Sequence, residues 1–479
     1  MTYPELPPEI WRKILRWYMA DQENNIMFIR DVNRLFYDVA MDHRFERLDL
    51  RDLSAGGAFE LQHVRDPWLT KRLKWICLST STLAQILTEE CYRSEHLLPS
   101  ALQNHRDETT HIIAPSSTVD SMLEAPLIEC LLDVLAGARN LRKIVVEVRS
   151  PPRADFRCIA FPRAFLHAAL ARLACGAFAG ATTTLALRVD YELLAVLLDE
   201  LALVQMPSLT DLAVVAEPRV KERVEPIGPV KGQAFFENLG RVPLESLRVF
   251  TKEKAVIASD ISSILDHDVI LPSVRRLDIA TTFDNPKMIK SLRANYPSLR
   301  VLILHIIAPD SGAGLPLSVL DLPNLLDLRL SVKAAFDAPA FSAFWHGHLN
   351  APRLTYLTVS GALAERMGPS RLRAAAPQVC ACFAGGAVRQ LEIHVGMLER
   401  ALLDALAAAF PGLRRLHIRA TRILDMARFE EEMGRCCYPG WDIRELKVEV
   451  TAPPFDLGNV DARVLAVIKS ALPRASGSS

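Results

Sequence analysis

Apolar residues recur along the chain in one short pattern. The pattern is L-x-x-L-x-L, with Ile or Val accepted in place of Leu, and its second half alternates apolar and polar positions. Alternation with a period of two indicates a β-strand that buries one face. The pattern starts at Leu141, Leu209, Leu244, Val274, Leu299, Leu325, Leu354, Val388, Leu413 and Ile443, and also at Thr182, where Thr stands in the first position. From Leu209 onward, successive starts lie 25 to 35 residues apart, so each repeat has room for a strand and a second element.

Stretches with helical spacing separate several of these strands. Their apolar residues recur every three or four positions, as on one buried face of an α-helix. These residues are Leu193, Leu194, Leu197, Leu198 and Leu201, then Met288, Ile289 and Leu292, then Leu398, Leu402, Leu403 and Leu406. A strand, a helix and a second strand in the same direction predict right-handed crossovers and a parallel sheet. We therefore expect an α/β fold.

A single strand and helix cannot bury their own apolar sides, so neighbouring repeats must stack to form a core. The recurrence resembles the leucine-rich-repeat family over roughly residues 141–450. This resemblance implies an irregular solenoid with a parallel, curved sheet. The alternative is an ordinary leucine-rich α/β protein without stacked repeats.

Residues 1–50 follow a different pattern, with two short apolar runs at helical spacing. Pro7 and Pro8 suit the first turn of a helix that carries Ile10 and Ile14. After a polar turn, the second run contains Met27, Phe28, Val32, Leu35, Phe36 and Val39. So small a module has few residues for a core of its own, and we therefore expect part of its apolar surface to be kept for a partner.

The order of these residues resembles the F-box family. The family's opening Leu-Pro, Glu-Ile and Ile-Leu, followed by its V-[CSN]-[KR] segment and an aromatic residue, match Leu6, Pro7, Glu9, Ile10, Ile14, Leu15, Val32, Asn33, Arg34 and Phe36. The resemblance implies that the module binds the Skp adaptor of a cullin-RING ubiquitin ligase. The implied adaptor-binding residues are Leu6, Pro7, Glu9, Ile10, Ile14, Leu15, Val32 and Phe36. The repeats would then hold a target protein of unknown identity.

These patterns divide the chain into four parts. We expect an F-box-like helical module at 1–50, and a linker with an early repeat and a polar insertion at 51–140. A leucine-rich-repeat solenoid with a C-terminal helical cap should cover 141–472, followed by a flexible tail at 473–479. The alternative for the first part is a helical cap of the solenoid, since terminal repeats need capping. The chain would then be a protein-interaction scaffold with no ligase role.

The composition indicates which classes of partner and which cellular compartment to expect. Lys and Arg together number 56, as do Asp and Glu, so the net charge is zero and no basic field favours nucleic acid. The start of the chain lacks the basic and apolar regions of a secretory signal, and no apolar run reaches membrane-spanning length. Nine cysteines, an odd number, suggest reduced thiols in the cytoplasm or nucleus. We therefore expect neither a nucleic-acid nor a membrane partner.

Motifs for catalysis and metal binding are weak. Cys380, Cys382, Cys436 and Cys437 lack paired C-x-x-C spacing, so buried free thiols explain them more simply than a metal site. There is no G-x-S-x-G elbow, phosphate-binding loop or kinase signature. We therefore expect a chain that is not an enzyme and that needs no cofactor or metal.

The target-binding surface follows from the strand pattern. If the leucines point into the stack, the residues between them lie on the opposite face of the sheet. The candidate target-binding residues are Arg276, Asp278, Arg329, Tyr356, Glu392, His394, Arg415, His417 and Arg419. The alternative is that these positions are polar only because water covers them.

Overall fold

The computed structural model describes residues 7, 9–11, 13–14, 34–51, 66–83, 126–148, 160–175, 184–217, 233–251, 268–281, 292–307, 320–333, 349–361, 387–423, 425–451 and 460–472. The chain divides into two compact units. Unit 1 comprises residues 1–214 with 241–243. Unit 2 comprises residues 215–240 with 244–479.

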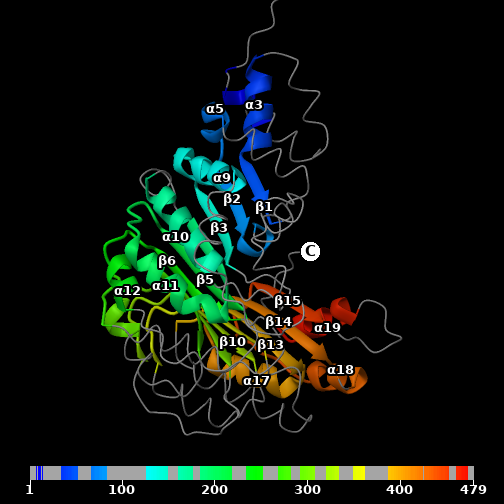
Figure 1. Cartoon of the computed structure of the whole chain (residues 1–479). Helices are drawn as coiled ribbons and strands as arrows, with labels where there is room; N and C mark the ends of the chain where they lie inside the picture. The colour runs from blue at the N-terminus through cyan, green and yellow to red at the C-terminus, as the bar shows by residue number, and fades with distance from the viewer. Residues whose placement is uncertain are drawn as a thin grey trace, which may run out of the picture. The chain divides into compact units, whose positions relative to one another are not determined.

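The predicted α/β class with a parallel sheet is confirmed. Thirteen parallel strands form an open sheet in which the order in space follows the order along the chain (Figure 1). They are β1 (Arg47–Leu50), β2 (Trp75–Ser79), β3 (Lys143–Val148), β4 (Thr184–Asp190), β5 (Asp211–Glu217), β6 (Ser246–Thr251), β7 (Arg276–Thr281), β8 (Val301–Ile307), β10 (Asp327–Lys333), β12 (Tyr356–Gly361), β13 (Gln390–Met397), β14 (Arg415–Arg422) and β15 (Glu445–Val450). A separate pair joins β9 (Leu320–Asp321) to β11 (Leu349–Asn350). Each predicted repeat places its strand two residues after the first position of the pattern, as β14 follows Leu413.

The recurring x-Pro-x-Leu sequence is a tight turn that leads into a strand. In "YPSL" the amide of Leu299 donates to the carbonyl of Tyr296 at 3.2 Å, and in "FPGL" the amide of Leu413 donates to the carbonyl of Phe410 at 3.1 Å. Proline suits the second position of such a turn because its φ is already fixed near the required value. The first and last residues of the turn, such as Tyr296 and Leu299, are buried. The turn therefore anchors the start of each strand in the core.

In-register rows of apolar side chains form the core of unit 2. The first row is Leu247, Leu277, Leu302, Leu328, Leu357, Leu391, Leu416 and Leu446, each paired with the next across neighbouring strands. A second row runs parallel to it through Ile279, Leu304 and Leu330. Most of these side chains are fully buried. The alternation predicted from the sequence therefore selects one buried face of the sheet.

Helices cover the strands of unit 1. They are α3 (Arg34–Phe45), α5 (Pro67–Thr70), α9 (Pro126–Gly137), α10 (Ala160–Cys175), the short 3₁₀ turn η1 (Tyr191–Leu193) and α11 (Leu194–Leu203). Helix α10 packs against both α9 and α11, and the three lie in a row in Figure 1. The predicted helix around Leu194, Leu197 and Leu201 is confirmed as α11, and all three side chains are buried.

Unit 2 contains α12 (Gln233–Leu239), α17 (Arg400–Ala409), α18 (Met426–Gly434) and α19 (Val460–Ser470). The predicted helix through Leu402, Leu403 and Leu406 is α17, which buries all three side chains. Helix α19 packs against β15 and α18, where the sequence places a C-terminal helical cap. The predicted helical residues Met288 and Ile289 lie outside the described residues.

Parallel pairing begins before residue 141, the expected start of the repeats. Strand β1 pairs in register with β2, and β2 pairs with β3. Both early strands follow a buried residue at the same offset as the later repeats, Phe45 for β1 and Leu73 for β2. Strand β2 therefore lies where the sequence predicts an early repeat, within residues 51–140. The sequence did not predict β1, because its residues belong to the part of the chain that the pattern predicts as a helical module, 1–50.

An arginine after α5 holds α3 beside the first strands. The guanidinium of Arg72 contacts the carboxylates of Asp38, at 3.0 Å, and Asp42 on α3. It also lies 3.9 Å from the ring centre of Trp68, which suits a cation–π contact. The second part of the N-terminal module is thus attached to unit 1 by ion pairs and by β1.

Candidate protein-binding surface

The predicted target-binding residues fall into register rows on the face opposite the leucines. One row contains Arg276, Val301, Asp327, Tyr356, Gln390, Arg415 and Glu445. The next contains Arg248, Asp278, Ile303, Arg329, Thr358, Glu392, His417 and Lys447. A third includes His394, Arg419 and Glu449. We call this face, defined by these three rows, the polar face.

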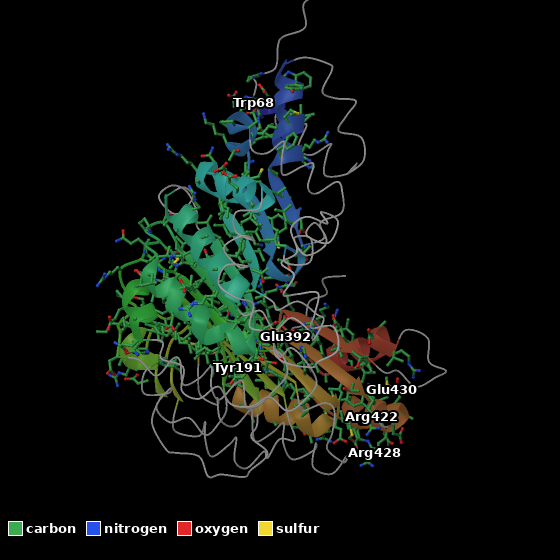
Figure 2. The ribbon with its side chains drawn as sticks, viewed as in Figure 1. Trp68, Tyr191, Glu392, Arg422, Arg428 and Glu430 are labelled. Atoms are coloured by element: carbon green, nitrogen blue, oxygen red, sulfur yellow. The ribbon has the colours of Figure 1, made fainter. Side chains whose placement is uncertain are left out.

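Glu392 on β13 is the centre of a compact cluster on the polar face, and Figure 2 labels it. Its Oε2 accepts a hydrogen bond from the hydroxyl of Tyr356 at 3.2 Å. Its Oε1 lies 3.2 Å from Nε2 of His394, 3.4 Å from Nη1 of Arg419 and 3.7 Å from Nδ1 of His417. Both carboxylate oxygens are therefore engaged, so Glu392 positions its neighbours more than it contacts solvent.

The cluster constrains the protonation of His394. Its Nε2 lies 3.4 Å from Nη1 of Arg419 as well as 3.2 Å from Glu392. One ring nitrogen cannot donate to a carboxylate and accept from a guanidinium at the same time. The shorter contact favours the tautomer whose Nε2 carries the proton and donates to Glu392.

Two acidic residues of the cluster have lowered pKa values. Burial alone would raise the pKa of Glu392, but the hydrogen bond from His394, the charges of Arg419 and His417 and the Tyr356 hydroxyl together lower it below its usual range. The hydrogen bond from Lys447 lowers the pKa of Glu449, and Glu449 also lies 2.9 Å from Nε of Arg419. Both carboxylates therefore stay ionised well below neutral pH.

The two predicted arginines of β14 belong to separate ion pairs. Nε of Arg415 lies 3.0 Å from Oε2 of Glu445, whereas Arg419 contacts Glu392 and Glu449. Each of the two guanidinium groups is therefore placed directly against a carboxylate.

Arg329 and Tyr356 form a neighbouring pair on β10 and β12. The guanidinium of Arg329 donates to Asp327 through Nε and Nη2, and its carbon lies 5.2 Å from the ring centre of Tyr356. The hydrogen bond to Asp327 raises the pKa of Arg329. Because the Tyr356 hydroxyl also contacts Glu392, this pair is continuous with the cluster.

A second polar cluster surrounds Asp278 on β7. Its carboxylate lies 3.1 Å from Nε of Arg248 and 2.9 Å from Nε2 of His305, and the ring of His305 stacks on Phe250 at 5.7 Å. The sequence named Asp278 but missed Arg248, Phe250 and His305. The repeat that starts at Leu244 places Arg248 at an intervening position, so the same alternation would have found it.

The predicted adaptor-binding residues are only partly described. Pro7 and Glu9 are exposed, and Ile10 and Ile14 are 40% and 42% exposed on a helical segment. Phe36 belongs to α3, of which only the backbone is described at that position. Leu6, Leu15 and Val32 lie outside the described residues. The exposed isoleucines are four residues apart, so they share one face of a helix.

Neither known protein families nor curated proteins match this chain. No family model matches the sequence, and no curated protein is similar to it.

In the part of the chain that the structure describes, no group of three or more His, Cys, Asp or Glu side chains is placed to hold a metal ion. Two imidazoles and a carboxylate do meet at Glu392, but the guanidinium of Arg419 already lies 3.4 Å from both Glu392 and His394. Of the candidate cysteines, Cys436 is half-buried and Cys437 is exposed, whereas Cys380 and Cys382 lie outside the described residues.

Membrane-spanning character is also absent from the helices that the structure describes, since none of them is both long and apolar enough to cross a bilayer.

Among the described residues of unit 1, Cys77 and Cys130 are buried free thiols. Burial raises the pKa of Cys77 to about 12, so this thiol stays protonated and packs as a small apolar side chain.

We expect the free energy of unfolding to decrease as the pH falls from about 7 to about 4. Burial lowers the pKa of His417 below its usual 6.5, so the unfolded chain binds this proton first and stability is lost below that pH. The pKa of Glu392 is also lowered, from its usual 4.5, so its ionised form stabilises the folded chain above pH 4.5. This stabilisation is lost in more acidic solution, as Glu392 becomes protonated. Urea midpoints measured across this pH range should fall less steeply near neutrality for His417→Gln and less steeply in acid for Glu392→Gln. The exposed Glu445→Gln is the control, and a slope changed equally by all three would contradict the assignment.

Proposed function

We propose that this chain is the substrate-recognition subunit of a Skp-cullin-F-box ubiquitin ligase, built as an F-box-like module followed by leucine-rich repeats. The observation that carries the proposal is the exposure of Ile10 and Ile14 on one face of an N-terminal helical segment. An uncovered apolar face suits a partner surface, because burying it against the adaptor would supply the hydrophobic centre of an interface.

The polar face supports the other half of the proposal. Candidate target residues from β7 to β14 lie in register on one side of unit 2, and Glu392 fixes Tyr356, His394 and Arg419 by direct contacts. A surface preorganised in this way loses little side-chain entropy when a protein binds to it. The repeats would hold the target while the module holds the adaptor.

In this function the bond-forming chemistry belongs to the partners. The chain brings a lysine of the target close to a conjugating enzyme that the cullin carries. Tethering raises the effective concentration of the two reactants, so the rate increases without a catalytic side chain from this protein. The place of action would be the cytoplasm or the nucleus.

A scaffold without a ligase role is the second candidate, and one observation favours it. Strand β1 pairs with β2, and Arg72 ties α3 to unit 1 through Asp38 and Asp42. Part of the N-terminal module therefore covers the first strands as a capping element would. The two functions differ in whether the segment before α3 binds an adaptor.

Partner identification by mass spectrometry separates these functions. The full chain and a version that lacks residues 1–33 should be purified from a eukaryotic host under the same conditions. This deletion keeps α3 and β1, since removing β1 would leave the edge of β2 unpaired. We expect the Skp adaptor and a cullin only with the full chain. Absence of both from both samples would favour the scaffold.

A further inference from the structure

Most Arg and Lys side chains that form ion pairs on the polar face share an asymmetry of burial. Four of these cations lie against carboxylates that are more buried: Arg248 against Asp278, Arg329 against Asp327, Arg419 against Glu392 and Glu449, and Lys447 against Glu449. The four cationic side chains are 41% to 65% exposed, whereas the four carboxylic side chains are 10% to 34% exposed. The carboxylates thus lie beneath the cations.

This asymmetry changes what an approaching protein meets. The formal charges of these four cations and four carboxylates cancel, yet the outer layer consists of guanidinium and ammonium groups. A guanidinium has five N–H donors, and Arg329 uses only Nε and Nη2 on Asp327. Donors on the solvent side can therefore form charge-assisted hydrogen bonds with a second carboxylate.

The ion pair of Arg415 with Glu445 sets a limit to this layer. Arg415 and Glu445 are equally exposed, at 54% and 55%, so they present both charges to solvent. Among the histidines, His417 reverses the asymmetry, at 19% against 34% for its partner Glu449, whereas His394 follows it, at 28% against 20% for Glu392. Cations therefore dominate the exposed charge between β10 and β15, apart from Glu445.

We propose that the polar face binds an extended protein segment rich in aspartate and glutamate. The inference deepens the proposed function and rests on it for one point, that this face is the one that holds the target. Carboxylates of such a segment would lie over the exposed cations, whose orientation is already fixed by the acids beneath them. Tyr356, which contacts both Arg329 and Glu392, would supply the flat apolar surface between them.

Fluorescence anisotropy with the full chain tests this inference. The probes are a fluorescein-labelled peptide rich in Asp and Glu, the same peptide with Asn and Gln in their place, a Lys-rich peptide, and a short single-stranded RNA. We expect binding of the acidic peptide only, with an affinity that falls as salt is added. Equal affinity for the acidic and neutral peptides, or preference for RNA, would overturn the inference.

Variants locate the binding to the polar face. Arg329→Gln with Lys447→Gln should lower the affinity for the acidic peptide by about tenfold or more, because two charge-assisted contacts are lost. The matched control removes two cations that are also paired with carboxylates, Arg428 of α18 and Arg435 at its C-terminal cap, as Arg428→Gln with Arg435→Gln, and should bind like wild type. Arg428 lies on that helix in Figure 2. Equal weakening by both double variants would overturn the assignment of the site.

A further variant guards against misfolding. If the urea midpoint of the first double variant falls, Lys447→Glu replaces it, since Glu449 keeps Arg419 as a partner when Lys447 is changed. This variant should also bind the acidic peptide more weakly, and unchanged affinity would count against the inference.

Adaptor binding, measured with the same preparations, separates this inference from the proposed ligase role. Adaptor capture without peptide binding would remove only the inference, whereas peptide binding without adaptor capture would remove only the ligase role.

Discussion

Leu328→Ala is expected to lower the free energy of unfolding of unit 2 by about 2 to 5 kcal/mol. Leu328 is fully buried on β10, where it lies in register between Leu302 and Leu357. Truncation would leave a cavity in the middle of the leucine row, which the neighbouring strands cannot fill because their own side chains are fixed by the same register. Urea unfolding followed by circular dichroism measures the change in midpoint.

Leu326, the residue directly before β10, offers a control for this variant. Leu326 is two residues earlier and 38% exposed, and its amide, which donates to the carbonyl of Arg300, is unchanged by a side-chain truncation. Leu326→Ala should therefore change the stability by less than about 0.5 kcal/mol. If the two variants have equal midpoints, the leucine row is not the core of the unit.

Ile10→Asp combined with Ile14→Asp is expected to weaken adaptor binding by at least about a hundredfold. Two central apolar anchors of an interface commonly contribute about 2 kcal/mol or more each, and a buried unpaired carboxylate adds a further cost. Because both isoleucines are exposed in the chain alone, its urea midpoint should not change. Isothermal titration calorimetry with a purified Skp adaptor measures the affinity.

The control for this double variant introduces the same residues elsewhere. Leu203 and Ile270 are also exposed apolar residues, at 72% and 57%, and lie outside the N-terminal module. Leu203→Asp with Ile270→Asp should bind the adaptor like wild type. If both double variants bind equally well, the face of Ile10 and Ile14 is not the adaptor site.

The sequence predicts the strands of this fold well because one row of apolar residues recurs with a fixed relation to each turn. Every strand from β3 onward in the main sheet begins at the same offset from the start of its repeat. A single pattern therefore predicts both where each strand lies and which of its side chains are buried. Strand β1 was missed although it has the same offset from a buried residue, Phe45. Its short R-L-D-L sequence directly follows a helix and was included in the helical module, and only its pairing with β2 identifies it as a strand of the sheet.

The sequence predicts many positions of the polar face, though not Arg248, and it does not predict their interactions. Alternation along a strand tells which side Glu392 and Arg419 share, and the register then brings them within 3.4 Å. Alternation cannot tell how deeply each charged group lies. That depends on side-chain length and on the cations that reach over the shorter carboxylates, as Arg329 does over Asp327. The outer cationic layer was therefore visible only in three dimensions.

Reconstitution with purified components tests the substrate-receptor role most directly. The full chain would be mixed with a Skp adaptor bound to a cullin and its RING subunit, and the mixture separated by size-exclusion chromatography with light scattering. An established F-box protein serves as the positive control. We expect the chain to elute with the adaptor and cullin in a one-to-one complex, and to elute apart from them when Ile10 and Ile14 are both changed to Asp. Separate elution of the wild-type chain, under conditions where the positive control forms its complex, would contradict the account.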